Sequence, residues 1–141
     1  MAAIAFTTGN ISPGTTTDAT GACSIQRAIA GATITAGMDI VIKASDGLGY
    51  PAQATATTMA SAGGVALNPA LPSQPFNYCD SGPVNFGTTV LSTGQHYILG
   101  ATAGQIHPAA DLTSGWFSSR LGWAYSASVL VVDRKNTGVQ N

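Results

Sequence analysis

The chain offers few side chains that could carry out acid–base, nucleophilic or metal chemistry. Its two histidines are His96 and His107, and all six acidic residues are aspartates. The histidine spacing is not that of a zinc-binding pair, so a metal site would need cysteine or aspartate ligands from elsewhere. Four of the aspartates, Asp39, Asp46, Asp80 and Asp111, each stand beside a glycine or at an expected strand end, where Asp commonly forms turns. This inventory favours turn and core roles over catalysis.

Motifs of covalent catalysis and of phosphate binding are absent from the sequence. No serine stands in the G-x-S-x-G turn of α/β-hydrolases, and no glycine-rich stretch matches the G-x-x-x-x-G-K phosphate loop. We therefore expect no enzymatic activity, no cofactor and no bound metal. A small hydrolase or lyase with a hidden Asp–His site is a minor alternative, because a linear sequence does not show which side chains meet in space.

The two cysteines, Cys23 and Cys79, are too few for the disulfide framework that staples small secreted domains. We expect two free and partly buried thiols, because cysteine is among the most buried residue types even when unpaired. A bridge between them is the open alternative, and it would need an oxidising compartment.

Two tryptophans and an arginine gather in the last third of the chain. Arg120 stands between Trp116 and Trp123 and is one of only five basic residues, so we expect it to make a specific ion pair or interface contact. Tryptophan, tyrosine and arginine are the residues that most often anchor protein interfaces. We therefore take these three as candidates for a subunit interface. The same rings, with the four tyrosines, could instead form a platform on which a sugar stacks.

The composition places these residues in a single domain with very little surface charge. The chain has 141 residues, 45% of them hydrophobic and 8% charged, with a formal net charge of −1. The lack of a basic cluster argues against a nucleic-acid partner. No apolar run is long enough to span a membrane as a helix, and the first residues do not have the pattern of a signal peptide. A surface so poor in charge suits burial against other proteins.

The elements that must position these residues follow the pattern of a β protein. From Cys23 onward, short β-branched and aromatic runs alternate with turns rich in Gly, Pro, Asn or Asp. This spacing predicts an all-β fold, a small β-barrel or sandwich, over residues 23–141.

An internal repeat runs through the β region. Gly37–Ile42 matches Gly94–Leu99, because each begins with a glycine turn and ends with three apolar residues. In both copies a Pro-Ala pair follows, and then a Gly-apolar-Ala-apolar element. We expect two similar units, at about residues 31–68 and 87–126, each too small to bury its own face and therefore packed against the other.

Residues 1–22 are rich in Thr, Gly and Ser and keep no helical or strand period. Their apolar anchors are Ile4, Phe6 and Ile11. We expect either a frayed terminus or an extended N-terminal arm that orders against a partner, in which case these three side chains bind the partner.

The repeat residues are similar to a known family. The matching segments are Gly37–Ile42, Asp46–Gly47, Tyr50–Ala52, Gly63–Asn68, Ser81–Gly87, Gly94–Tyr97, Gly104–Pro108 and Leu121–Ala124. Together they cover roughly residues 31–132 and resemble the head decoration (capsid cement) proteins of tailed bacteriophages. Trp123 stands where that pattern has Val or Ile, which points to a different contact surface in this chain.

The resemblance implies a β protein without enzymatic activity that binds the outer surface of an icosahedral capsid and bridges major capsid subunits. It implies two partners, the major capsid protein and further copies of the chain in a homotrimer. It also implies a location on the virion after synthesis in the host cytoplasm. The alternative is another phage surface module, part of a fibre or spike, that binds host glycans through its tryptophans and tyrosines.

Overall fold

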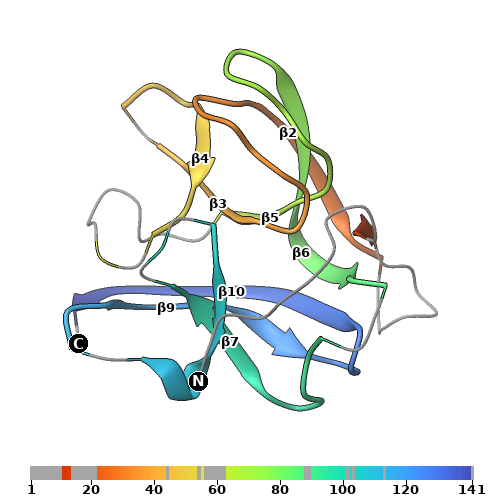
Figure 1. Ribbon diagram of the computed structural model, residues 1–141, viewed down its shortest axis with the longest axis vertical. Coiled ribbons are helices and arrows are strands. Elements are labelled where there is room, and N and C mark those ends of the chain that lie inside the picture. The colour runs from red at the N-terminus through yellow and green to blue at the C-terminus, as the bar shows by residue number, and fades with distance from the viewer. Residues whose placement is uncertain are drawn as a thin grey trace.

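The structure is a computed structural model that describes residues 11–13, 22–43, 45–53, 55, 63–87, 90–100, 102, 104–112 and 114–140, with the backbone alone at 13, 117, 118 and 135–140. The described residues form β-strands and one 3-10 turn, η2 (Ala109–Asp111), and no α-helix. The predicted all-β fold is confirmed, and it takes the form of a curled antiparallel sheet (Figure 1).

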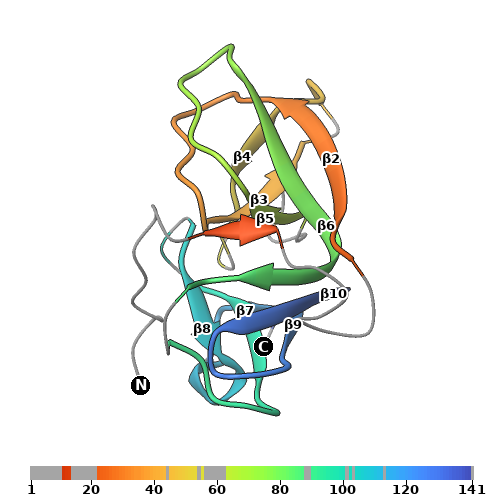
Figure 2. The ribbon, with the colours of Figure 1, turned by 90° about the vertical axis from the view of Figure 1, so that its right-hand side faces the viewer.

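The strands are β1 (Ser12–Pro13), β2 (Ser24–Ile29), β3 (Asp39–Ile42), β4 (Gly49–Pro51), β5 (Gly64–Ala66), β6 (Pro75–Asn85), β7 (His96–Leu99), β8 (Ile106–Pro108), β9 (Phe117–Ala124) and β10 (Val129–Gln140). Their order in the sheet is β4-β3-β5-β6-β10-β9-β7-β8, and β1 and β2 pair separately with β6. Figure 2 shows β2 to β5 in the upper half and β7 to β10 in the lower half, with β6 running from one to the other.

Two three-stranded units pair in equivalent registers. Their strand orders are β4–β3–β5 and β8–β7–β9, so the central strand of each unit is its first in sequence, and we call the units the first and the second meander. The equivalent residue pairs are Ile40–Pro51 with Tyr97–Pro108, and Ile40–Gly64 with Tyr97–Gly122. Gly37 and Gly94 precede the two units and both have positive φ, at 92° and 82°. The equivalence is one of strand pairing, and a duplicated unit stays a prediction from the sequence.

Two apolar clusters form the interior. The upper core contains Ala30, Ile34, Ile40, Ala66, Ala70 and Phe76. The lower core contains Val41, Ala52, Val65, Cys79, Val84, Phe86, Leu91, Tyr97, Leu99, Ile106, Leu121, Ala124, Leu130 and Val132. Because β3 lies between the two clusters, Ile40 faces the upper core and Val41 the lower core. This double burial explains why β3 has an unbroken apolar run instead of an alternating pattern.

Cys23 and Cys79 form a disulfide, which corrects the expectation of two free thiols. β2 pairs with β6 so that Ile25 lies opposite Cys79. This register brings the Cα atoms of the two cysteines to 5.9 Å, a usual separation for a disulfide. The cysteines are 56 positions apart in the chain, and only the pairing of two distant strands brings them together.

Candidate binding face

The outer side of the second meander carries a group of aromatic and charged side chains. On three neighbouring strands, His96 lies opposite Trp123 and Trp123 lies opposite Val131. Residues directly opposite in an antiparallel sheet point to the same face. We call this surface the Trp123 face, and it consists of His96, Arg120, Trp123, Tyr125, Val131 and Asp133.

Arg120 organises the polar part of the Trp123 face. Its Nη2 donates to Oδ2 of Asp133 at 2.7 Å, and its Nε donates to the backbone oxygen of Asp133 at 3.3 Å. Its Nη1 lies 3.3 Å from Nδ1 of His96. The specific ion pair expected of this scarce charge is therefore present. An ion pair with such exposed partners contributes only about 0–1 kcal/mol to stability, so its main effect is to orient the guanidinium group.

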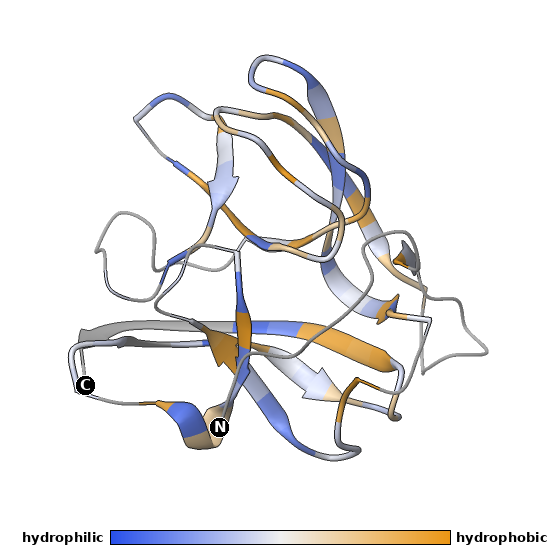
Figure 3. Ribbon diagram, in the orientation of Figure 1, coloured by the Kyte–Doolittle hydropathy of each residue, from blue (hydrophilic) through white to orange (hydrophobic). Residues whose placement is uncertain are grey.

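Trp123 and Tyr125 form the apolar part of the Trp123 face. The ring centroids are 6.1 Å apart and the ring planes are inclined by 58°. Trp123 is half-buried, and Tyr125 keeps 44% of its surface exposed. Figure 3 shows the apolar start of β10 giving way to a hydrophilic segment. Aromatic and charged groups thus meet on a rigid, hydrogen-bonded sheet.

Trp116 has different neighbours from the other two predicted interface residues. It packs against the lower core, and its ring meets the ring of His107 edge-on, with centroids 5.3 Å apart. Arg120 and Trp123 share one face, and the contacts of Trp116 lie with His107 and the core.

His107 and Asp111 form the Asp–His pair that the sequence left as a minor alternative. Nδ1 of His107 lies 2.8 Å from Oδ2 of Asp111, and the two side chains are 13% and 6% exposed. A Cβ added at Gly100 would come within 2.8 Å of Nε2, so backbone closes the far side of the ring, and Trp116 covers its edge. This geometry fits a structural pair that holds η2 against β8. The local order His-Pro-x-x-Asp was the available signal.

Asp46 is a turn residue, whereas the expected turn or strand-end position is wrong for Asp80, which lies within β6. Oδ1 of Asp46 accepts from the Leu48 N–H at 2.9 Å, and Oδ2 accepts from the Tyr50 hydroxyl at 2.7 Å. These hydrogen bonds lower the pKa of Asp46, with the Leu48 bond first. A turn role was wrong for Asp39, which begins β3, is fully buried, and has no hydrogen-bond partner for either carboxylate oxygen among the described residues. Burial raises its pKa well above the ordinary value.

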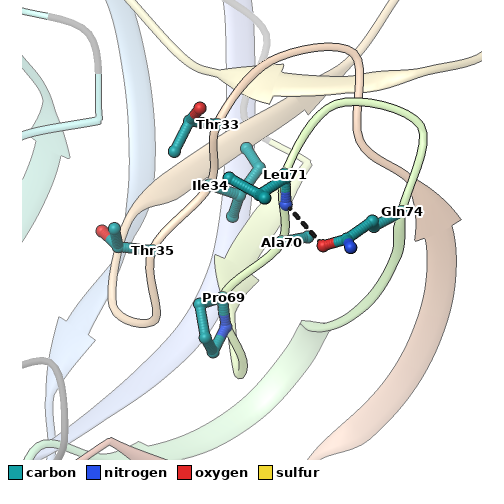
Figure 4. A pocket seen from close by; sticks show the side chains of 7 residues that line it. All are labelled: Thr33, Ile34, Thr35, Pro69, Ala70, Leu71 and Gln74. Atoms are coloured by element: carbon teal, nitrogen blue, oxygen red, sulfur yellow. Dashed lines mark hydrogen bonds between the residues drawn. The ribbon is translucent and has the colours of Figure 1, made fainter.

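Two open hollows lie in the upper half of the molecule, away from the Trp123 face. The first, of about 310 Å³, is mostly apolar and is lined by Thr33, Ile34, Thr35, Pro69, Ala70, Leu71 and Gln74 (Figure 4). The second, of about 370 Å³, is lined by Arg27, Asn68, Pro75, Phe76 and Asn77. The lining of neither hollow brings together titratable groups that could act as acid and base.

The predicted capsid-binding arm falls mainly outside the described residues, which include neither Ile4 nor Phe6. Ile11 is half-buried and packs against the lower core of its own chain. Ser12 and Pro13 form β1 opposite Asn85 and Val84 of β6. The part of the segment that the structure describes is therefore joined to the sheet.

The described part of the chain holds no group of three or more His, Cys, Asp or Glu side chains close enough to bind a metal ion. Among the same residues, no helix has the length and apolar character needed to cross a bilayer. Comparison of the chain with protein-family models, curated proteins and solved structures finds no match. Function therefore has to be inferred from the fold and the Trp123 face.

Proposed function

We propose that the chain is a structural protein of a virus particle. It binds the outer capsid surface, bridges neighbouring major capsid subunits and associates with further copies of itself, and it acts without catalysis or a cofactor. The resemblance of its repeat residues to head decoration proteins suggests this role. The single observation that supports it is the Trp123 face, whose partly exposed Trp, Tyr and Arg are the residue types that anchor protein interfaces.

The form of the Trp123 face favours a macromolecular partner over a small molecule. Small-molecule sites are enclosed pockets that surround most of their ligand. The Trp123 face lies on the outer side of three paired strands. Strands held in place by their neighbours lose little conformational freedom on binding, so less of the contact energy is spent on ordering them.

Binding of this kind would stabilise a capsid by mass action. A protein that binds the mature shell and not its disassembled subunits stabilises the shell by about 2.7 kcal/mol per site when its free concentration is 100 times its Kd. Association of several copies would convert weak single contacts into tight attachment, because the second contact becomes intramolecular.

The test uses expanded shells assembled from the major capsid protein encoded with this chain. We expect the purified protein to sediment with the shells to a fixed occupancy and to raise their melting temperature. Deletion of residues 2–10, which keeps Ile11 and β1, should weaken this binding and leave the melting temperature of the protein unchanged. Failure of the full chain to sediment with shells at micromolar concentration would refute the proposed function.

The second candidate function is glycan binding by a fibre or spike module. The observation that favours it is the pair of adjacent rings, Trp123 and Tyr125, beside the Arg120–Asp133 pair. Sugars stack on such rings and accept hydrogen bonds from planar polar groups. Titration with an array of glycans while tryptophan fluorescence is monitored would separate this function from the first, which needs no sugar.

A further inference from the structure

The two meanders have equivalent outer faces, of which the first is fully buried and the second is partly exposed. By register, the equivalent residues are Asp39 with His96, Val65 with Trp123, and Cys79 with Val131. The three residues of the first meander and its neighbouring strand are all fully buried. Of their counterparts in the second, His96 is exposed and the other two are half-buried.

The covered face shows what this geometry can bind. Val65 and Cys79 pack in the lower core against side chains from the inner side of the second meander and β10, among them Leu121 and Leu130. An outer face of this type therefore already forms one apolar contact within the molecule. The Trp123 face repeats the strand arrangement and places larger apolar groups on it.

A complementary surface lies on β2. Ile25 and Ile29 are 50% and 41% exposed, which makes them two of the four large exposed apolar side chains among the described residues. Arg27 stands between them at the same parity and is also exposed, so all three point to one side of the strand. We call Ile25, Arg27 and Ile29 the β2 row.

The β2 row carries one arginine, and the Trp123 face carries a partly exposed carboxylate that could accept from it. Within the described part of the chain no carboxylate pairs with Arg27. On the Trp123 face, the side chain of Asp133 is 51% exposed although it already accepts from Arg120. A carboxylate has about four lone-pair sites, so it can accept from a second arginine.

We propose that the Trp123 face of one copy binds the β2 row of a second copy. Ile25 and Ile29 then pack on Trp123, Tyr125 and Val131, and Arg27 approaches Asp133. The proposal rests on the proposed function, which requires the copies to associate. It adds to that function by naming the two surfaces that join them. Because the two surfaces differ, the contact is head to tail, and a bound pair keeps one free β2 row and one free Trp123 face.

The test uses two variants of the full chain, each with one surface disrupted. Trp123→Ser removes the aromatic anchor, and the double variant Ile25→Asp, Ile29→Asp places charge in the β2 row. Light scattering should show association of the wild-type protein, which each variant alone weakens by about tenfold or more. An equimolar mixture of the two variants should form 1:1 dimers, because one intact surface of each kind remains. Leu71→Ser, at another exposed apolar side chain, should associate as the wild type does.

Several outcomes would overturn the inference. A wild-type protein that is monomeric at high micromolar concentration would do so. Undiminished association of the β2 variant would point instead to a contact between two Trp123 faces. Circular dichroism melts check that each variant is folded. A protein that stays monomeric and still binds shells would refute this inference alone. A protein that self-associates but does not bind shells would refute the proposed function alone.

Discussion

Asp39 carries a carboxyl group that is fully buried without a hydrogen-bond partner among the described residues. Burial raises its pKa well above the ordinary value, so Asp39 stays neutral to a higher pH in the folded chain than in the unfolded chain. In the unfolded chain, the Asp39 carboxyl ionises near pH 4. Above about pH 4 the folded state therefore binds more protons than the unfolded state, and the free energy of unfolding falls by up to about 1.4 kcal/mol per pH unit until the folded-state pKa is passed. We expect Asp39→Asn to remove this decline.

Urea unfolding of the wild type and Asp39→Asn between pH 4 and pH 9 measures this effect. The free energy of unfolding of Asp39→Asn, relative to that of the wild type, should increase as pH rises. Asp46→Asn is the control with the opposite sign, because hydrogen bonds lower the pKa of Asp46 and stabilise its charged form. Its loss of stability should be present at neutral pH and vanish as pH falls through the folded-state pKa. Parallel pH curves for the wild type and Asp39→Asn would show that Asp39 is not held neutral.

Gly122 and Gly94 give a matched pair of substitutions for the second meander. A Cβ on Gly122 would overlap the backbone carbonyl of Val131 on the neighbouring strand, whereas Gly94 has positive φ and open space around it. We expect Gly122→Ala to cost about 3 kcal/mol or more, because β9 and β10 would have to separate. Gly94→Ala should lower the free energy of unfolding by only about 1–2 kcal/mol, which is the cost of placing a residue with a Cβ in the left-handed backbone conformation. Chemical denaturation measures both, and equal losses would contradict the close approach of β9 and β10.

The strands that could be predicted from the sequence are those whose signal is local. Ile40–Ile42 and Tyr97–Leu99 are apolar runs that follow a glycine turn, and the structure has strands there. Pairing between distant strands has no such signal. The meeting of β2 with β6 therefore escaped prediction, and the disulfide with it.

The candidate site was predictable in residue type but not in placement. Arg120 and Trp123 could be singled out because charged residues are few and tryptophan is a common interface anchor. Their partners, Asp133 and Tyr125, depend on strand register. The buried position of Asp39 depends on the packing of one meander against the other, which no local pattern encodes.

The disulfide bears on the stability of the whole molecule because it closes a long loop. Cys23 and Cys79 are 56 positions apart, and the chain-entropy model gives about 4 kcal/mol for a loop of this size, with strain and residual structure reducing it. We expect reduction to lower the free energy of unfolding by about 2–4 kcal/mol. Denaturant midpoints with and without reductant measure this. Cys23→Ser is the control and should not respond to reductant. A wild-type midpoint that ignores reductant would contradict a structural role for the bridge.

The lower core makes the two halves of the chain depend on each other. It combines residues of the first half, such as Val41 and Val65, with Leu121 of the second. A fragment of residues 87–141 would lack the apolar residues of the first half that cover its side of the lower core. We therefore expect the fragment to be unfolded in isolation. The full chain should unfold in one transition, because the outer face of the first meander lies in the lower core while its inner face lies in the upper core.

Substitutions in the two cores test this coupling. Ile34→Ala in the upper core and Leu121→Ala in the lower core remove fully buried side chains, and each should cost about 2–5 kcal/mol. Both should lower the midpoint of the same transition, whether it is followed by tryptophan fluorescence, which reports on the second half, or by far-UV circular dichroism, which reports on all strands. Two separate transitions, each moved by one substitution alone, would mean that the second meander is stable without its cover. Packing against the outer face of the first meander would then not be needed for stability. The main argument that the equivalent Trp123 face binds a partner would be lost.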